Sequence, residues 1–168
     1  MSFISLLRIW KPGNSVSEQK TKASIEPAEN EVVFFLKMDC DEARVQLGMR
    51  ASDKKATCDY VVFYTRRSKN SEERRSVLCL LELKGCDIDH AIDQVIATRE
   101  HIKQSLRILQ GTDVWPYVQR PTWKAYICCN PKSAIVPSKK YALTIEKAFG
   151  KNNFKITHND DPGSFLRN

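Results

Sequence analysis

Residues 58–85 read CDYVVFYTRRSKNSEERRSVLCLLELKG and contain two runs that are typical of β-strands. The first run, 58–64, is rich in Val, Tyr and Phe, and the second, 77–83, is apolar nearly throughout. A continuous apolar run of this length is typical of a central strand that is covered on both faces. The segment between them, 66–76, is charged and has no apolar residue, which predicts the connection of a long hairpin.

A long amphipathic helix is predicted directly after the second strand. From Ile88 to about Leu109, apolar residues recur at the 3.6-residue spacing of a helix with one buried face. Either Asp87 or Asp89 can cap its N-terminus, and Gly111 is placed to end it. Strands that precede a helix in this way predict a sheet with helices packed on it.

Further strands and a second helix extend this pattern on both sides. Residues 123–129 and 154–157 are expected to be strands, and 140–149 a helix ended by Gly150. The run 31–37 (EVVFFLK) fits either a strand or the buried face of a helix, because periodicity cannot separate the two over so short a length. The predicted fold class is therefore α/β, with a mixed central β-sheet flanked by helices.

The two ends of the chain are predicted to contribute less to this sheet. Residues 1–10 are apolar and are expected to form a short helix, while 11–30 are polar with two prolines and one glycine, which predicts a linker or loop. Residues 43–49 alternate weakly, as a strand would. The expected organisation is an N-terminal apolar segment and linker (1–30), an α/β domain (31–157) and a polar, frayed C-terminal tail (158–168).

Composition narrows the class of partner. The chain has 168 residues, with 27 Lys plus Arg against 20 Asp plus Glu, so its net charge is +7. A basic balance favours an anionic partner, first a nucleic acid and second an anionic membrane surface, although a basic surface can also serve solubility alone. No apolar run approaches the roughly 18–20 residues of a membrane helix, and the N-terminus does not resemble a signal peptide.

The cysteines and the missing motifs exclude several classes of site. The six cysteines include no C-x-x-C pair, and several lie inside apolar runs, which predicts reduced, buried thiols in a cytoplasmic protein. The three histidines do not complete a zinc site with them. The sequence also lacks the common glycine-rich phosphate loops and the G-x-S-x-G elbow of serine hydrolases.

Charged residues at the strand ends are the strongest sign of chemistry. Asp59 lies at the start of the first strand, and Glu82 and Lys84 share one face at the end of the second. If the two strands pair, Asp59 reaches the same end of the sheet as Glu82. Two converging carboxylates repel each other, and a divalent cation offsets that repulsion. Ligands that are all oxygen favour Mg²⁺ or Mn²⁺.

The CDYVVFY run, the LLELKG run and the helix that follows resemble the PD-(D/E)XK nuclease superfamily, which has the restriction-endonuclease-like fold. The resemblance covers roughly residues 58–105, and 123–129 looks like the next core strand. Cys58 stands where the family name has proline. The superfamily often has a glutamate in its first helix as well, for which Glu31 and Glu42 are both candidates.

The resemblance implies a role for each matched residue. Asp59 and Glu82 look like the two metal-binding carboxylates, and the Leu83 backbone carbonyl like a further ligand. Lys84 looks like the lysine of E-x-K, which orients the attacking water and offsets the phosphate charge, and Gln94 like a supporting glutamine in the helix. The implied activity is Mg²⁺- or Mn²⁺-dependent hydrolysis of phosphodiester bonds, with DNA as the expected substrate. Small nucleases of this fold also commonly form dimers.

Two other functions stay open on the sequence. The chain could be a nucleic-acid-binding or assembly subunit that keeps the fold without catalysis. It could also be an adaptor that docks on a membrane or on a partner through the apolar segment 1–10, although that segment could equally pack on its own domain.

Basic and aromatic residues supply candidates for nucleic-acid contacts. A charged hairpin connection is often merely solvated, and aromatic residues in an apolar setting are more often core. The basic candidates are Arg66, Arg67, Arg74, Arg75, Lys139 and Lys140, and the aromatic ones are Trp115, Tyr117 and Trp123.

Overall fold

The structure is a computed structural model of the full chain. It describes residues 9–18, 21–49, 57–67, 74–84, 87–107, 121–132, 135–158 and 161–168. None of the helices in these ranges has the length and apolar character that crossing a bilayer requires.

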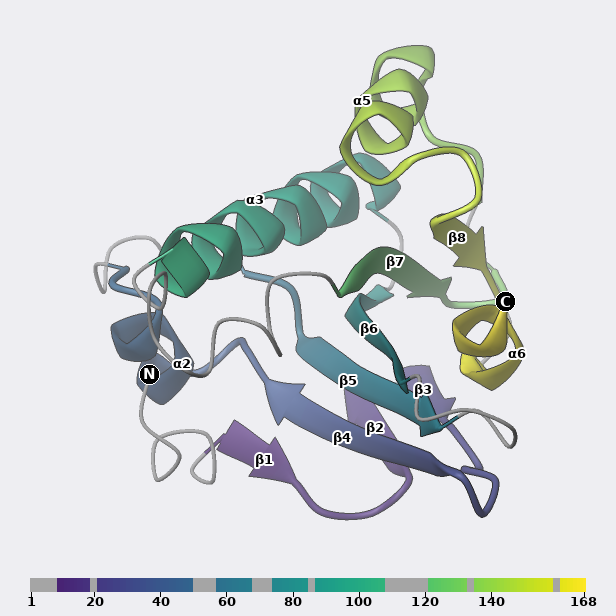
Figure 1. Ribbon diagram of the computed structural model, residues 1–168. Helices are drawn as coiled ribbons and strands as arrows, with labels where there is room; N and C mark the ends of the chain where they lie inside the picture. The colour runs from purple at the N-terminus through teal and green to yellow at the C-terminus, as the bar shows by residue number, and fades with distance from the viewer. Residues whose placement is uncertain are drawn as a thin grey trace.

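A twisted six-stranded sheet forms the centre of the fold (Figure 1). Its strands lie in the order β1-β4-β5-β6-β7-β8. Neighbours are antiparallel from β1 through β6, whereas β6, β7 and β8 run parallel to one another. The strands are β1 (Trp10–Lys11), β4 (Glu31–Lys37), β5 (Tyr60–Arg67), β6 (Arg74–Lys84), β7 (Thr122–Cys129) and β8 (Phe154–Thr157).

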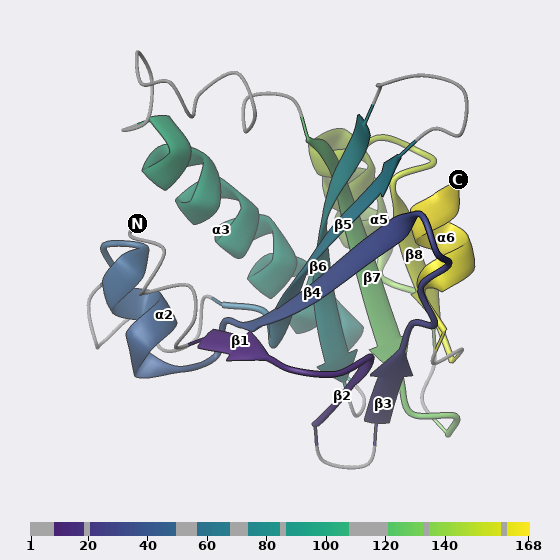
Figure 2. The same ribbon diagram turned by 60° about the horizontal axis from the view of Figure 1, so that its bottom comes forward.

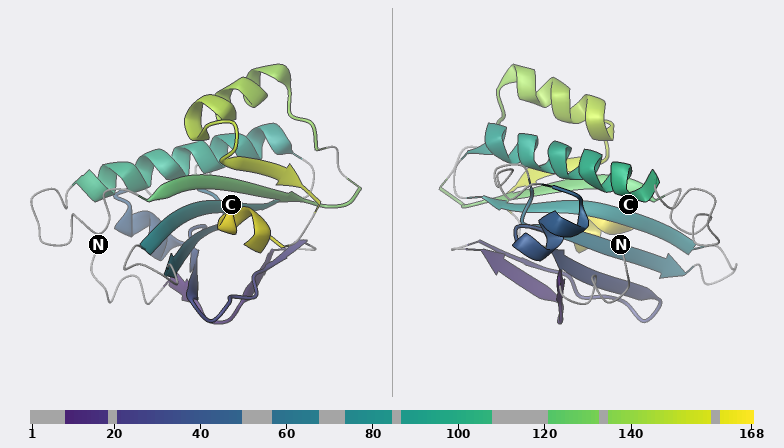
Figure 3. Two further views of the ribbon diagram at one scale, coloured as in Figure 1. Left: turned by 45° about the vertical axis from the view of Figure 1, so that its right-hand side comes forward. Right: turned by 90° about the vertical axis from the view of Figure 1, so that its left-hand side faces the viewer.

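The two faces of the sheet are covered by different elements (Figures 2 and 3). Helices α3 and α5 connect the parallel strands and pack on one face, together with the short helix α2. The antiparallel hairpin β2–β3 and the C-terminal helix α6 pack on the other. These elements are α2 (Asp41–Gln46), α3 (Ile88–Arg107), α5 (Lys139–Phe149), α6 (Gly163–Arg167), β2 (Ser15–Glu18) and β3 (Thr21–Ser24).

Strand β6 shows how the sheet divides the core in two. Leu78 and Leu80 pack in the cluster under α3, and we call this side the helical face. Cys79, Leu81 and Leu83 pack against the β2–β3 hairpin and α6, and we call this side the hairpin face. Both clusters are apolar, so β6 is buried on both sides, as its sequence predicted.

The predicted fold class is confirmed at the level of a mixed α/β sheet flanked by helices. The run 31–37 is a strand, and the long helix begins at Ile88. Asp87 caps that helix, since its side chain accepts the His90 backbone N–H at 3.0 Å. Gly150 ends α5 with φ at 87°, a conformation that favours glycine. Gly111, the predicted end of α3, lies outside the described residues.

Residues 11–30, predicted as a linker, instead form the end of β1 and the β2–β3 hairpin. The hairpin alternates buried Val16 and Ala23 with exposed Ser and Lys, and Ile25 follows it into the core. Each strand has only four residues and buries small or single apolar side chains. The local signal is therefore weak, and packing on the hairpin face overrides it.

Two other local predictions are wrong. Residues 43–49, expected as a strand, begin within α2, where Ala43 and Leu47 lie one helical turn apart and are both buried. The C-terminal tail, expected to be frayed, ends in α6, whose Leu166 is fully buried. At the other end, residues 1–8 of the predicted N-terminal helix lie outside the described residues. Ile9, which follows them, packs in the chain's own core.

Five of the six cysteines lie in the described residues, and most of them match the expectation of buried, unpaired thiols. All five are free thiols, and all but the half-buried Cys40 are buried. Burial raises the pKa of the Cys79 thiol to about 12, because a thiolate is poorly solvated inside the protein, although the charge of Lys124 acts to lower it. These thiols therefore act as small apolar core residues.

Candidate active site

Strand register brings Asp59 and Glu82 together. Tyr60 pairs with Leu81 in the antiparallel β5–β6 ladder, so the preceding residue, Asp59, lies opposite Glu82. The Asp59 backbone N–H donates to Glu82 Oε2 at 3.0 Å, and the Leu83 backbone N–H donates to Asp59 Oδ2 at 2.8 Å. Each carboxylate is thus held by a backbone group of the opposite strand, which fixes both side chains at one end of the sheet.

The two carboxylates differ in burial. Glu82 follows Leu80 on the helical face and is fully buried, whereas Asp59 is half-buried. Burial raises the pKa of the neighbouring Cys58 thiol well above its ordinary value, and the negative charges of Glu82 and Asp59 raise it further. A buried carboxylate is costly without a hydrogen bond or a compensating charge, and the Asp59 N–H supplies one such bond to Glu82.

Helix α3 holds the segment that carries Asp59. Gln94 Nε2 donates to the Thr57 backbone carbonyl at 2.9 Å. One turn later, Thr98 Oγ1 accepts the Cys58 backbone N–H at 2.8 Å and donates to the Gln94 carbonyl at 2.8 Å. Gln94 and Thr98 thus hold the backbone of the two residues that precede Asp59.

Thr98 was missed by sequence reasoning, although a local signal for it exists. Gln94 and Thr98 are polar residues spaced i, i+4, and they fall among the buried apolar residues Ala91, Ile92 and Val95 of α3. Gln94 Oε1 and Thr57 Oγ1 are buried and have no hydrogen-bond partner within the part of the chain that the structure describes. Gln94 Oε1 can accept a hydrogen bond from water or a bound group, and Thr57 Oγ1 can accept or donate one.

The remaining residues of the predicted site lie on the same strand end. Leu83 and Lys84 are the last two residues of β6. Leu83 is buried, and its N–H binds Asp59. The side chain of Lys84 lies outside the described part of the chain, and the roles predicted for Lys84 and for the Leu83 carbonyl stay predictions.

Glu31 is not a site residue. It lies at the start of β4, opposite Arg66, about 20 Å from the strand end beside Asp59. Its carboxylate is buried, pairs with Arg167 at 2.9 Å and accepts the Tyr64 hydroxyl at 2.8 Å. The Arg167 hydrogen bonds lower the pKa of Glu31 to about 2. Glu42 lies near the site end of β4, but it is exposed on α2.

The donor set fits a hard divalent cation. Asp59, Glu82 and the Leu83 carbonyl offer oxygen atoms alone, the ligand type of Mg²⁺ and Mn²⁺. Among the described residues, no cluster of three or more His, Cys, Asp or Glu side chains is suited to a metal. Mg²⁺ typically uses one or two carboxylates and completes its shell with water and substrate oxygens, so two carboxylates are a sufficient set.

The four predicted arginines lie far from the two carboxylates. Arg66 pairs with Arg75, and Arg67 with Arg74, at the far end of the β5–β6 ladder. This end lies about 23 Å from Tyr60, the residue after Asp59. The other two candidates, Lys139 and Lys140, are exposed at the start of α5. That helix is tethered to α3, since the Ser138 N–H donates to Asp89 Oδ1 at 3.1 Å.

Of the three aromatic candidates, the structure describes Trp123. Trp115 and Tyr117 lie outside the described residues. Trp123 is half-buried on β7, with the Arg99 guanidinium 5.7 Å from its ring centre. Trp123 therefore packs against the core, as aromatic residues in an apolar setting usually do.

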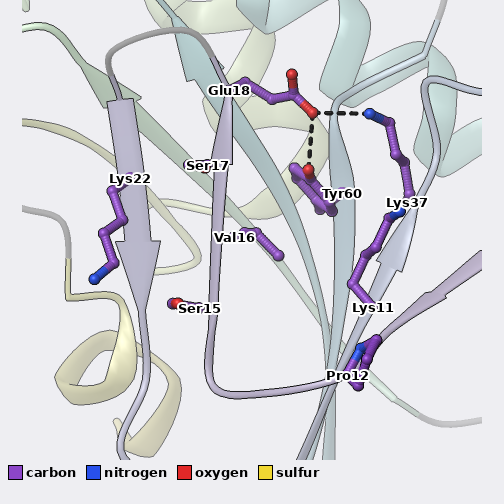
Figure 4. Close-up of a pocket in the computed structure, with 9 residues that line it drawn as sticks. All are labelled: Lys11, Pro12, Ser15, Val16, Ser17, Glu18, Lys22, Lys37 and Tyr60. Carbon is purple, nitrogen blue, oxygen red and sulfur yellow. Dashed lines mark hydrogen bonds and ion pairs between the residues drawn. The ribbon is translucent and has the colours of Figure 1, made fainter.

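A polar pocket of about 410 Å³ lies on the hairpin face, at the end of the sheet that carries Asp59 and Glu82 (Figure 4). The Glu18 carboxylate accepts bonds from Lys37 Nζ at 3.0 Å and from the Tyr60 hydroxyl at 2.8 Å. Burial acts to raise the pKa of Glu18, but the bonds from Tyr60 and Lys37 outweigh it and lower the pKa. Sequence reasoning missed this pocket because β2, which supplies Glu18, was predicted to be a loop.

Comparison with known proteins gives no match: no protein-family model, no curated protein and no solved structure is similar to this chain.

Proposed function

We propose that this protein is a metal-dependent nuclease with a restriction-endonuclease-like core, which hydrolyses phosphodiester bonds in DNA. The observation that carries the proposal is the reciprocal pair of hydrogen bonds that places Asp59 beside Glu82. The order of elements supports it, because the meander β4–β5–β6 leads into α3 and the parallel strand β7. The net charge of +7 suits an anionic polymer.

The residues have distinct roles in this proposal. Asp59, Glu82 and the Leu83 carbonyl would hold Mg²⁺ or Mn²⁺. A bound ion of this kind polarises the phosphate and lowers the pKa of water. Lys84 would orient the attacking water and offset the charge of the phosphate. Gln94 and Thr98 would keep Asp59 in place by holding Thr57 and Cys58.

A cleavage assay tests this proposal directly. Wild type, Asp59→Asn and Lys84→Ala are incubated with plasmid, linear duplex, single-stranded DNA and RNA, in Mg²⁺, Mn²⁺ or EDTA. Glu146→Gln, which removes one exposed carboxylate from α5, is the charge-matched control for Asp59→Asn. Circular dichroism checks that each variant is folded.

We expect wild type and Glu146→Gln to cut DNA only with a divalent metal, and both site variants to be inactive although folded. Cleavage that persists in folded Asp59→Asn would contradict the proposed site. A chain that binds nucleic acid but cuts none of these substrates would instead support the non-catalytic binding subunit.

A further inference from the structure

Three aromatic residues lie side by side on the helical face of the outer strands. Phe34 of β4 and Phe63 of β5 are directly paired, and their rings stack with centres 6.4 Å apart. Trp10 of β1 meets the Phe34 ring edge-on at 6.2 Å. We call Trp10, Phe34 and Phe63 the aromatic cluster.

The aromatic cluster is open to solvent, unlike the part of the helical face that α3 covers. Trp10 and Phe34 are each 40% exposed, and Val32 beside them is 44% exposed. Helix α3 packs on β6 and β7, which lie on the far side of β5 from β4 (Figure 1). Contiguous apolar surface of this kind marks a binding site more often than isolated exposed residues do.

Charged residues lie at both ends of the aromatic cluster, on the same face. Phe63 and Arg67 are four residues apart along β5, so strand alternation puts both on the helical face. Asp59 directly precedes β5, at the end of the sheet where Glu82 of β6 lies on that face. Asp59 is therefore about 13 Å from Phe63, and Arg67, paired with exposed Arg74, is about 13 Å beyond it. Along this part of the sheet, the Asp59–Glu82 pair thus lies toward one end, the aromatic rings lie in the middle, and two guanidinium groups lie at the other end.

We propose that this face binds single-stranded nucleic acid, with bases stacked on the aromatic cluster and phosphates bound by Arg67 and Arg74. This inference rests on the proposed function and names its substrate class. Aromatic rings stack on the faces of unpaired bases, and those faces are covered inside a duplex. The guanidinium groups match phosphate in charge and geometry. A strand bound here would lead to Asp59 and Glu82, which lie toward the other end of this part of the sheet.

Binding is measured without metal, so that it does not depend on cleavage. We call the surface from Asp59 through the aromatic cluster to Arg67 and Arg74 the track; it is about 26 Å long. Fluorescence anisotropy in EDTA therefore compares binding of a single-stranded oligonucleotide of about 12 nucleotides with binding of the same sequence as a duplex. Phe34→Leu removes the ring but keeps an apolar side chain, and Phe34→Trp keeps a ring. Leu143→Ala removes an exposed apolar residue from α5 and is the control for general surface effects.

We expect wild type to bind the single strand more tightly than the duplex. Phe34→Leu should weaken the affinity for the single strand by at least about fivefold, and Phe34→Trp and Leu143→Ala should weaken it by less than about twofold. Arg66, on the opposite face of the same strand end, provides the matched control for Arg67. Arg67→Ala should lower the slope of log K against log salt by about 0.7, whereas Arg66→Ala should leave it unchanged.

The proposed binding track would be overturned if Phe34→Leu and Phe34→Trp bound the single strand equally well, or if the protein preferred the duplex. A change in the oligomeric state of Phe34→Leu in the absence of oligonucleotide would also overturn it, because this face would then be a contact with a second copy of the chain. The two proposals also fail separately. If the protein binds the single strand through the track but does not cleave it, only the proposed nuclease activity is contradicted. If cleavage does not depend on Phe34 and Arg67, only the proposed track is contradicted.

Discussion

Two buried glutamates at opposite ends of the same sheet have contrasting surroundings. Glu31 is enclosed by groups that stabilise its charge: the Arg167 guanidinium, the Tyr64 hydroxyl and the Ala28 backbone N–H. Glu82 instead lies opposite a second carboxylate, Asp59, whose backbone N–H it accepts. Arg167 supplies the cation for Glu31, whereas Glu82 shares its end of the sheet with a second carboxylate. The comparison suggests a structural role for Glu31 and a functional role for Glu82.

The largest expected effect is on catalysis, and it separates the two glutamates. Glu82→Gln should lower kcat/KM by at least about 10³-fold, or about 4 kcal/mol, because it removes half of the proposed metal-binding pair. Glu31→Gln should change kcat/KM by less than about threefold at neutral pH. The measurement is kcat/KM at 25 °C for folded proteins, and similar losses in both variants would remove the contrast.

The next largest effect is on stability, where Glu31 is expected to be more sensitive to substitution than Glu82. Glu31→Gln should lower the free energy of unfolding by about 2–3 kcal/mol at pH 7, because Arg167 loses its partner while staying partly solvated. Urea denaturation of Glu31→Gln and of the exposed control Glu146→Gln measures this. An unchanged midpoint in Glu31→Gln would show that the ion pair is not stabilising.

The same ion pair gives a predicted pH dependence. The pKa of Glu31 is lowered from 4.5 to about 2, so its contribution is present above pH 4.5 and is lost as the pH falls toward 2. The stability difference between wild type and Glu31→Gln should therefore shrink between pH 5 and pH 2. A difference that stays constant over this range would mean that ionisation of Glu31 is not its source.

Metal should stabilise the protein through the other glutamate. At about 10 to 100 times its Kd, Mg²⁺ should raise the free energy of unfolding of wild type by about 1.4–2.7 kcal/mol. The increase should vanish in Asp59→Asn and persist in Glu31→Gln. Calorimetry with NaCl at matched ionic strength separates binding from screening, and equal stabilisation of all three proteins would argue against a site at Asp59.

The smallest expected effect comes from the helix that positions Asp59. Gln94→Ala should weaken Mg²⁺ binding by about tenfold, because outer-shell contacts typically contribute this much. All the proposed metal ligands are still present in this variant, so activity should recover at high Mg²⁺. Isothermal titration with Mg²⁺ measures the affinity, with Gln104→Ala on the exposed part of α3 as the control. Affinity equal to that of wild type would show that the contact with Thr57 does not orient Asp59.

The main strands and the long helix were predictable because their patterns are local. Runs such as 77–83 and the periodic stripe from Ile88 identify buried elements without knowledge of their partners. Asp59, Glu82 and Gln94 could be selected as candidates because they stand beside these elements. The β2–β3 hairpin and α6 escaped prediction because each depends on a few buried side chains in an otherwise polar segment.

The site geometry depends on contacts between distant residues, which no local pattern contains. The β5–β6 register sets Asp59 opposite Glu82, and a shift of one residue would turn the side chains of one strand to the other face. The ion pair of Glu31 joins residues that are 136 positions apart, and it explains why a candidate ligand proved structural. The sequence supplied the chemical groups, and long-range pairing determined which of them meet, because register and packing are properties of the whole sheet.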